Sequence, residues 1–155
     1  MATHVLDVPL AAQARSMSCW NASAQMIWWY WQGQSGRQGP MNSLRKEFAD
    51  NTGLSVSVAD FIRLAQAAGM QAVPRQQHYS SDGLVSMLKQ YGPLWCAGTW
   101  YGFGHVVVLT GVAGDIVYIN DPDGGIKKDG TVAWFNQKVM NHLDGCIMCK
   151  NPAAY

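Results

Sequence analysis

Apolar residues recur at helical spacing in the first part of the chain, along a segment that begins near Ser18 or Cys19 and ends near Gln32. The positions that share one stripe of this segment are Trp20, Ala24, Ile27, Trp28 and Trp31. This spacing predicts an amphipathic helix. Because large aromatic side chains dominate the burial in protein cores, we expect the stripe to pack into the core and not to bind a ligand.

Weaker helical patterns follow as far as residue 91. A short helix is expected near 42–50. A second should open at Ser57-Val-Ala-Asp60, a variant of the capping box, and end at Gly69. Ser81 is a candidate cap for a third helix over 82–90, which Gly92-Pro93 would end.

The pattern becomes strand-like from residue 93 to residue 150. The segments PLWCAGTW, HVVVLTGV and DIVYIND are rich in β-branched and aromatic residues, and Ala113-Gly114-Asp115 is a candidate hairpin turn. TVAWF and DGCIMC are expected to add strands, with a short helix near 134–141. Helices first and antiparallel strands second predict an α+β fold with a helical lobe and a sheet lobe.

Length and composition favour a single domain spanning residues 1–155. No Pro/Gly/Ser-rich linker separates the two halves, and apolar residues make up 48% of the sequence against 14% charged residues. The net charge is +1 without a basic cluster, which argues against a nucleic-acid partner.

The N-terminal segment MATHVLDVPLAAQAR lacks the charged region followed by an apolar region that marks a secretory signal peptide. No apolar run reaches the roughly 18 residues of a membrane span. We therefore expect synthesis in a cytoplasm without a signal peptide. In that compartment Cys19, Cys96, Cys146 and Cys149 should be thiols.

Cys19 is the first candidate for chemistry because it lies where the first helix should begin. Backbone amides at a helix N-terminus stabilise a thiolate and lower the pKa of a cysteine placed there. Most unpaired cysteines are nevertheless small buried hydrophobes. Position alone would favour that simpler interpretation.

A histidine and an orienting group can be found downstream. His105 opens the apolar run VVVLTGV directly after Gly-Phe-Gly, so its side chain could face a groove. Asp121 ends the neighbouring strand and could fix the imidazole tautomer, although an aspartate before proline is also a common turn residue. Asn120 is the rival orienter. The side-chain amide of Gln13 could donate a hydrogen bond to an oxyanion, or Gln13 could be a solvated loop residue.

The remaining cysteines carry weaker signals. Cys146-Ile-Met-Cys149 has redox-like spacing but lies in a strand-like segment, and only His142 lies near enough to add a zinc ligand. We expect structural thiols here and a core position for Cys96. No metal or cofactor is implied.

The order Gln13, Ser-Cys-Trp at 18–20, Gly104-His105 and Asp121-Pro122 resembles the papain-like cysteine proteases. Within that superfamily the chain is most similar to compact bacterial members, which include secreted effector proteases and the domains that trim leader peptides during export. The resemblance covers residues 8 to about 125.

It implies Cys19 as nucleophile, His105 as general base and acid, Asp121 as orienter and Gln13 as oxyanion donor. Larger papain-type enzymes use asparagine as orienter and have a longer segment between cysteine and histidine. The shorter segment leaves the substrate choice open.

The expected activity is hydrolysis of peptide bonds in a protein substrate through an acyl-enzyme. The same groups would also serve a glutamine deamidase, an acyltransferase or a peptidoglycan amidase. A non-catalytic binding domain is the alternative from another class.

At most twelve residues precede Gln13, too few for a papain-type propeptide, so restraint should come from elsewhere. One such source is a cognate inhibitor or immunity protein that covers the cleft, with Trp100, Tyr101 or Phe103 as contacts. The resemblance thus implies a bacterial effector or toxin. It would be made in the bacterial cytoplasm and would reach another cell through a specialised secretion system.

Overall fold

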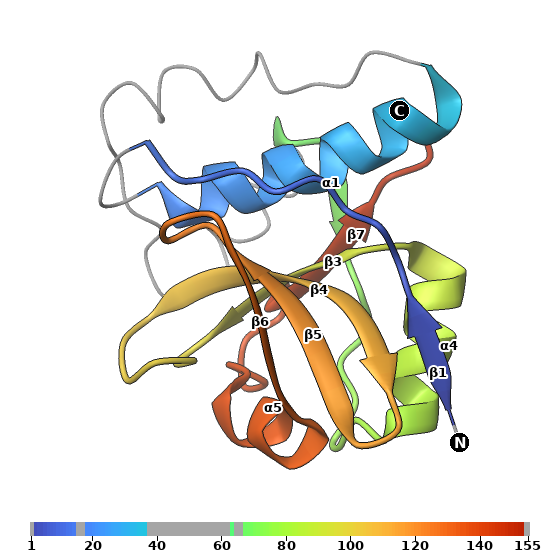
Figure 1. The fold of residues 1–155 in the computed structure, drawn as a ribbon, viewed down its shortest axis with the longest axis vertical. Helices are drawn as coiled ribbons and strands as arrows, with labels where there is room; N and C mark the ends of the chain where they lie inside the picture. The colour runs from blue at the N-terminus through green and yellow to red at the C-terminus, as the bar shows by residue number, and fades with distance from the viewer. Residues whose placement is uncertain (1, 15–17, 37–62, 64–66, 154–155) are drawn as a thin grey trace.

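The computed structural model describes residues 2–14, 18–36, 63 and 67–153. Its fold is α+β, with the Cys19 helix first and an antiparallel sheet carrying His105 and Asp121 after it, as the sequence predicts (Figure 1). The helices are α1 (Cys19–Ser35), α4 (Ser81–Tyr91) and α5 (Val132–Lys138). The strands are β1 (Thr3–Val5), β2 (Met70–Ala72), β3 (Leu94–Gly98), β4 (His105–Ala113), β5 (Ile116–Asp121), β6 (Ile126–Thr131) and β7 (Ile147–Lys150).

Within the described residues the strands form one sheet in the order β2-β7-β3-β4-β5-β6, and β1 pairs with β4 off this path. Every pairing is antiparallel. The β4–β5 hairpin turns at Gly114-Asp115, because Ala113 pairs with Ile116. Gly114 has φ +60°, a left-handed conformation that glycine adopts without a steric cost. This confirms the predicted hairpin.

Helix α1 packs on the central strands β3, β4 and β7 and lies across the sheet at the top of Figure 1. Its buried residues include Trp20, Ala24 and Ile27 of the predicted stripe. Trp28 and Trp31, farther along the stripe, are only half-buried. The stripe is therefore part of the core only in its first half.

The cap of α4 lies one residue earlier than the sequence suggested. Ser80, not Ser81, has the extended N-cap conformation, and its hydroxyl accepts a hydrogen bond of 3.0 Å from the Gly83 amide. Ser81 is the first helical residue, and its hydroxyl donates to the Gly114 carbonyl instead. The helix ends at Gly92, as predicted.

TVAWF was the wrong choice for a strand. The Thr131 hydroxyl accepts from the Trp134 amide at 3.0 Å and caps α5, so the apolar residues after Thr131 belong to a helix. The strand that precedes it is the polar segment IKKDGT of β6. DGCIMC does contribute β7, as predicted.

Two expected helices, near 42–50 and over 57–68, lie almost wholly outside the described residues. The short strands β1 and β2 were not predicted. In the ranges that the structure does describe, no helix is long and apolar enough to cross a bilayer.

Candidate active site

Cys19 is the first residue of α1, and two hydrogen bonds fix that end of the helix against the sheet. One turn further along, the buried Ser23 hydroxyl donates to the Val106 carbonyl at 3.2 Å. The Trp95 indole donates to the Trp20 carbonyl at 3.1 Å. The half-buried Cys19 is thereby held beside the start of β4, where His105 is the first residue.

His105 is buried, and its Nε2 lies 2.6 Å from Asp121 Oδ1. Burial by itself would lower the pKa of His105. Hydrogen bonds to Asp121 and Cys19, together with the charges of both groups, outweigh that effect and raise the pKa to about 9. Because Nε2 is engaged by Asp121, Nδ1 is the nitrogen available to Cys19.

Asp121 ends β5 with its side chain buried. Burial would raise the pKa of its carboxyl, but hydrogen bonds from His105, Lys128 and the Asp123 amide hold the pKa below its usual value. The Asp123 amide donates to Oδ1 at 2.9 Å, and the Lys128 ammonium donates to Oδ2 at 2.8 Å. The carboxylate is therefore both charged and fixed in rotation.

Asn120, the rival orienter, has a different partner. Its Nδ2 donates to the Val8 carbonyl at 3.1 Å in a buried hydrogen bond. Adjacent side chains on a strand point to opposite faces of the sheet. Asn120 therefore contacts the N-terminal segment on one face, and Asp121 contacts His105 on the other. Asp121 is the one that the structure brings to His105.

Gln13 lies in the N-terminal segment that Asn120 secures. Its backbone amide donates to the Pro122 carbonyl at 2.7 Å, directly after Asp121. Gly125 allows this approach, because its φ is +63° and a Cβ there would lie 3.2 Å from Ala12. Gln13 is thus held beside the turn that follows Asp121, with its side chain half-buried.

A family described as "Papain-like cysteine protease AvrRpt2" matches residues 2–140 of this sequence. That span contains Gln13, Cys19, His105 and Asp121. The chain belongs to this family. It is accordingly a cysteine protease, a hydrolase.

The fold of this papain-like protease also occurs in a solved structure described as "Crystal structure of a double glycine motif protease from AMS/PCAT transporter in complex with the leader peptide". The TM-score is 0.57 at 23% identity, and the alignment covers 94% of this chain and 91% of the other. At that identity the likeness supports the fold alone. No curated protein matches the sequence.

Two exposed aromatic side chains flank His105 of the protease. The rings of Tyr101 and Phe103 lie 6.4 and 5.8 Å from the imidazole, and the residues are 40% and 55% exposed. Trp100, which the sequence suggested as a third surface contact, is 1% exposed, and its indole donates to the Cys96 carbonyl. That part of the prediction was wrong, because Trp100 turns inward to pack on Phe135.

The other three thiols of the protease have the structural character that the sequence predicted. Cys96, Cys146 and Cys149 are buried in the sheet region, and burial raises the pKa of each, to about 11 for Cys146. Among the described residues, no three His, Cys, Asp or Glu side chains are grouped to hold a metal ion.

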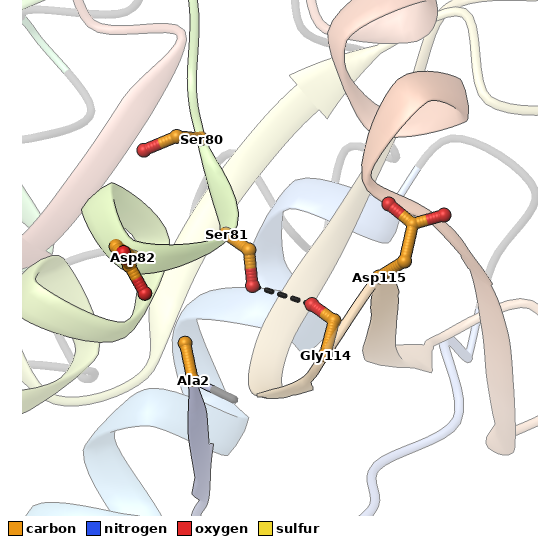
Figure 2. Close-up of a pocket in the computed structure, with 6 residues that line it drawn as sticks. All are labelled: Ala2, Ser80, Ser81, Asp82, Gly114 and Asp115. Carbon is orange, nitrogen blue, oxygen red and sulfur yellow. Dashed lines mark hydrogen bonds between the residues drawn. The ribbon is translucent and has the colours of Figure 1, made fainter.

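A pocket of about 410 Å³ lies elsewhere, between the start of β1, the start of α4 and the β4–β5 turn (Figure 2). Its lining residues are Ala2, Ser80, Ser81, Asp82, Gly114 and Asp115. The hydrogen bond from Ser81 to Gly114 crosses it. The lining includes neither a thiol nor an imidazole, so this pocket does not contain the predicted Cys19–His105 pair.

Lys128 is the site neighbour that sequence reasoning missed. Had Asp121-Pro-Asp-Gly-Gly125 been interpreted as a hairpin loop, the return strand would have begun at Ile126. In that register Lys128 pairs with Ile119 and lies diagonal to Asp121 on the same face. The turn composition was the available signal.

Proposed function

We propose that this protease hydrolyses peptide bonds in a protein or peptide substrate through a thioester, with Cys19 as nucleophile, His105 as base and acid, and Asp121 as orienter. The observation that carries the proposal is the 2.6 Å contact of His105 Nε2 with Asp121, made while the same imidazole interacts with the helix-start thiol. A buried imidazole with a raised pKa stays protonated beside the thiol, which favours a thiolate–imidazolium pair.

In the first half of the reaction, the Cys19 thiolate attacks the carbonyl carbon and forms a tetrahedral oxyanion. The imidazolium of His105 then gives its proton to the amide nitrogen as the C–N bond breaks. The leaving group departs as an amine, and the acyl group remains on Sγ as a thioester.

In the second half, neutral His105 takes a proton from water as the water oxygen attacks the thioester carbon. The C–S bond breaks, the acid product leaves, and the thiolate–imidazolium pair is restored. Asp121 accepts the hydrogen bond from Nε2–H throughout and stabilises the imidazolium, which is present at the start of the first half and is restored in the second. No cofactor enters either half.

Gln13 is the proposed oxyanion donor, together with the backbone amide of Cys19. The support is the bond from the Gln13 amide to Pro122, which fixes this segment beside the Asp121 turn. One such donor is worth roughly 3–4 kcal/mol of transition-state stabilisation in a well-studied protease.

We further propose that the substrate is a polypeptide, that the protease acts as a bacterial effector after delivery to another cell, and that an inhibitor protein covers the site. The family description and the leader peptide held by the similar solved protease support the first point. The resemblance to secreted effector proteases supports the second. Exposed Tyr101 and Phe103 beside His105 offer aromatic anchors for such an inhibitor.

The test is incubation of the protein with a peptide library, followed by mass spectrometry of new termini. Wild-type protein should create new N-termini, and Cys19→Ala should create none. A mass gain of about 1 Da at glutamine without cleavage would replace the protease assignment by deamidation. Cleavage that persists in Cys19→Ala would contradict the nucleophile assignment.

A further inference from the structure

A lysine from the last strand of the described sheet order completes the surroundings of Asp121. Lys128 Nζ lies 2.8 Å from Asp121 Oδ2, and the side chains are 35% and 1% exposed. The ammonium therefore reaches from a partly solvated position to a carboxylate that water does not reach. This contact joins β6 to the end of β5, beyond the backbone pairing of the two strands.

The two oxygens of Asp121 have different partners. Oδ1 accepts from His105 and from the Asp123 amide, whereas Oδ2 accepts from Lys128. Without Lys128, Oδ2 would be a buried charged oxygen without that donor, which costs free energy and favours protonation or rotation of the carboxyl group. Either change would weaken the bond that orients His105.

The ring of Tyr101 also contacts the ammonium. Its ring centroid lies 4.2 Å from Lys128 Nζ, within the range of a cation–π contact, and 6.4 Å from the His105 ring. The ring thus limits the freedom of the lysine at the rim of the site. Lys128, Asp121, His105 and Cys19 form a continuous chain of interacting groups.

We propose that Lys128 is a positioning residue of the protease, which holds Asp121 ionised and turned toward His105. This inference rests on the proposed roles of His105 and Asp121. Lys128 acts through Asp121 and need not touch the substrate.

The groups that bear on Asp121 come from several elements. Lys128 comes from β6, His105 from β4, Tyr101 from the loop between β3 and β4, and Asp123 from the turn after β5. Loss of the lysine removes both a positive charge and a hydrogen-bond donor from the carboxylate. Both losses raise the pKa of Asp121, so the sign of the effect is fixed.

The kinetic test compares Lys128→Met with Lys128→Arg, and with Lys127→Met as the matched control. Lys127 is the exposed neighbour on β6 and carries the same charge. Lys128→Met should lower kcat about 10-fold with little change in KM and move the acid limb of the kcat/KM profile to higher pH. Lys128→Arg should restore most of the loss, and Lys127→Met should behave as wild type.

A second readout needs no substrate. The pKa of the Asp121 carboxyl, followed by carbon NMR in the folded protein, should rise in Lys128→Met and stay unchanged in Lys127→Met and Lys128→Arg. Thermal unfolding of each variant checks that the fold is retained. If Lys128→Met does not fold, Lys128→Gln replaces it in both measurements.

The outcomes separate this inference from the proposed function. An unchanged pKa of Asp121 in Lys128→Met would overturn the inference, whatever the activity. A raised pKa with unchanged kcat and pH profile in an active enzyme would overturn the role in the reaction. Wild-type protein inactive on every peptide would instead count against the proposed function, and the NMR shift would still test the ion pair.

Discussion

The molecule has two environments for cysteine, and they differ in partners as well as in burial. Cys19 begins a helix, is half-buried and interacts with His105, whose other side bonds Asp121. Cys96, Cys146 and Cys149 are buried in the sheet region, where burial raises the pKa of each thiol. All four are the same chemical group in one chain of 155 residues.

We expect this difference in surroundings to make Cys19 the nucleophilic thiol of the four. A thiolate needs a nearby cation and a polar environment, which the start of α1 and the imidazole supply. The sheet supplies neither, because its interior penalises charge. Each prediction below removes one contribution to this difference.

The largest effect on kcat is expected from replacing Cys19 or His105 by alanine, with a buried thiol replaced for comparison. Cys19→Ala should lower kcat by about 10⁴-fold or more, because the nucleophile is lost, and His105→Ala should do the same. Cys149→Ala should leave kcat within about 2-fold, since that thiol takes no part in the chemistry. Turnover of a peptide substrate checks all three. A defect in Cys149→Ala as large as that in Cys19→Ala would contradict the comparison.

Removing the group behind His105 should make Cys19 more like the sheet thiols. Asp121→Ala should reduce kcat by about 10³-fold, less than loss of either member of the pair, and slow alkylation of Cys19. Asn120→Ala should cost about 10-fold, because its side chain holds Val8 and not His105. The reverse order of the two kcat values would make Asn120 the orienter.

The proposed oxyanion donor, Gln13, should act only after the thiolate has formed. Gln13→Ala should lower kcat roughly 100-fold with little change in KM, while alkylation of Cys19 stays at the wild-type rate. Steady-state kinetics and iodoacetamide labelling measure the two quantities separately. An unchanged kcat would mean that another donor fills the oxyanion site.

Direct labelling compares the reactivity of the four thiols without a substrate. Iodoacetamide at neutral pH should modify Cys19 at least about 10-fold faster than Cys96, Cys146 or Cys149. Equal labelling of the four thiols would refute the assignment of Cys19.

Because the pKa of His105 is raised to about 9, its proton is present below that pH and lost above it. Peptide hydrolysis should therefore decline as the pH rises through about 9.

The smallest effect concerns stability. Here we expect substitution of a buried sheet thiol to cost more free energy of unfolding than substitution of Cys19. Cys96→Ser places a hydroxyl in the interior and should lower the free energy of unfolding by about 1–3 kcal/mol. Cys19→Ser, at a half-buried site, should change it by less than about 0.5 kcal/mol. Denaturant unfolding measures both. A larger loss for Cys19→Ser would mean that this site also matters for stability.

Sequence predicted the parts of the fold that carry strong periodicity. Helix α1 and strands β3, β4 and β5 bury long apolar runs, so their patterns indicate their structure directly. The same patterns pointed to Cys19, His105 and Asp121, which the structure brings together. Their catalytic roles stay predictions until the variants are measured.

The missed elements have physical reasons. Strand β6 is polar and largely exposed, so no apolar alternation marks it. The helix after Thr131 begins at a Thr131 cap, whereas the β-branched and aromatic residues of TVAWF had suggested a strand. Lys128 escaped notice because its role depends on the register of β5 against β6, which no local pattern specifies.

The hydrogen bond from Asn120 to Val8 joins residues 112 positions apart in the chain. Closing so long a loop is entropically costly, and contacts of this kind form slowly during folding. We therefore expect the N-terminal segment that carries Gln13 to dock only after β5 has formed. During refolding, recovery of turnover should lag behind formation of the central sheet. We thus expect a newly folded chain to pass through a stage in which its central sheet is assembled while the protease is still inactive.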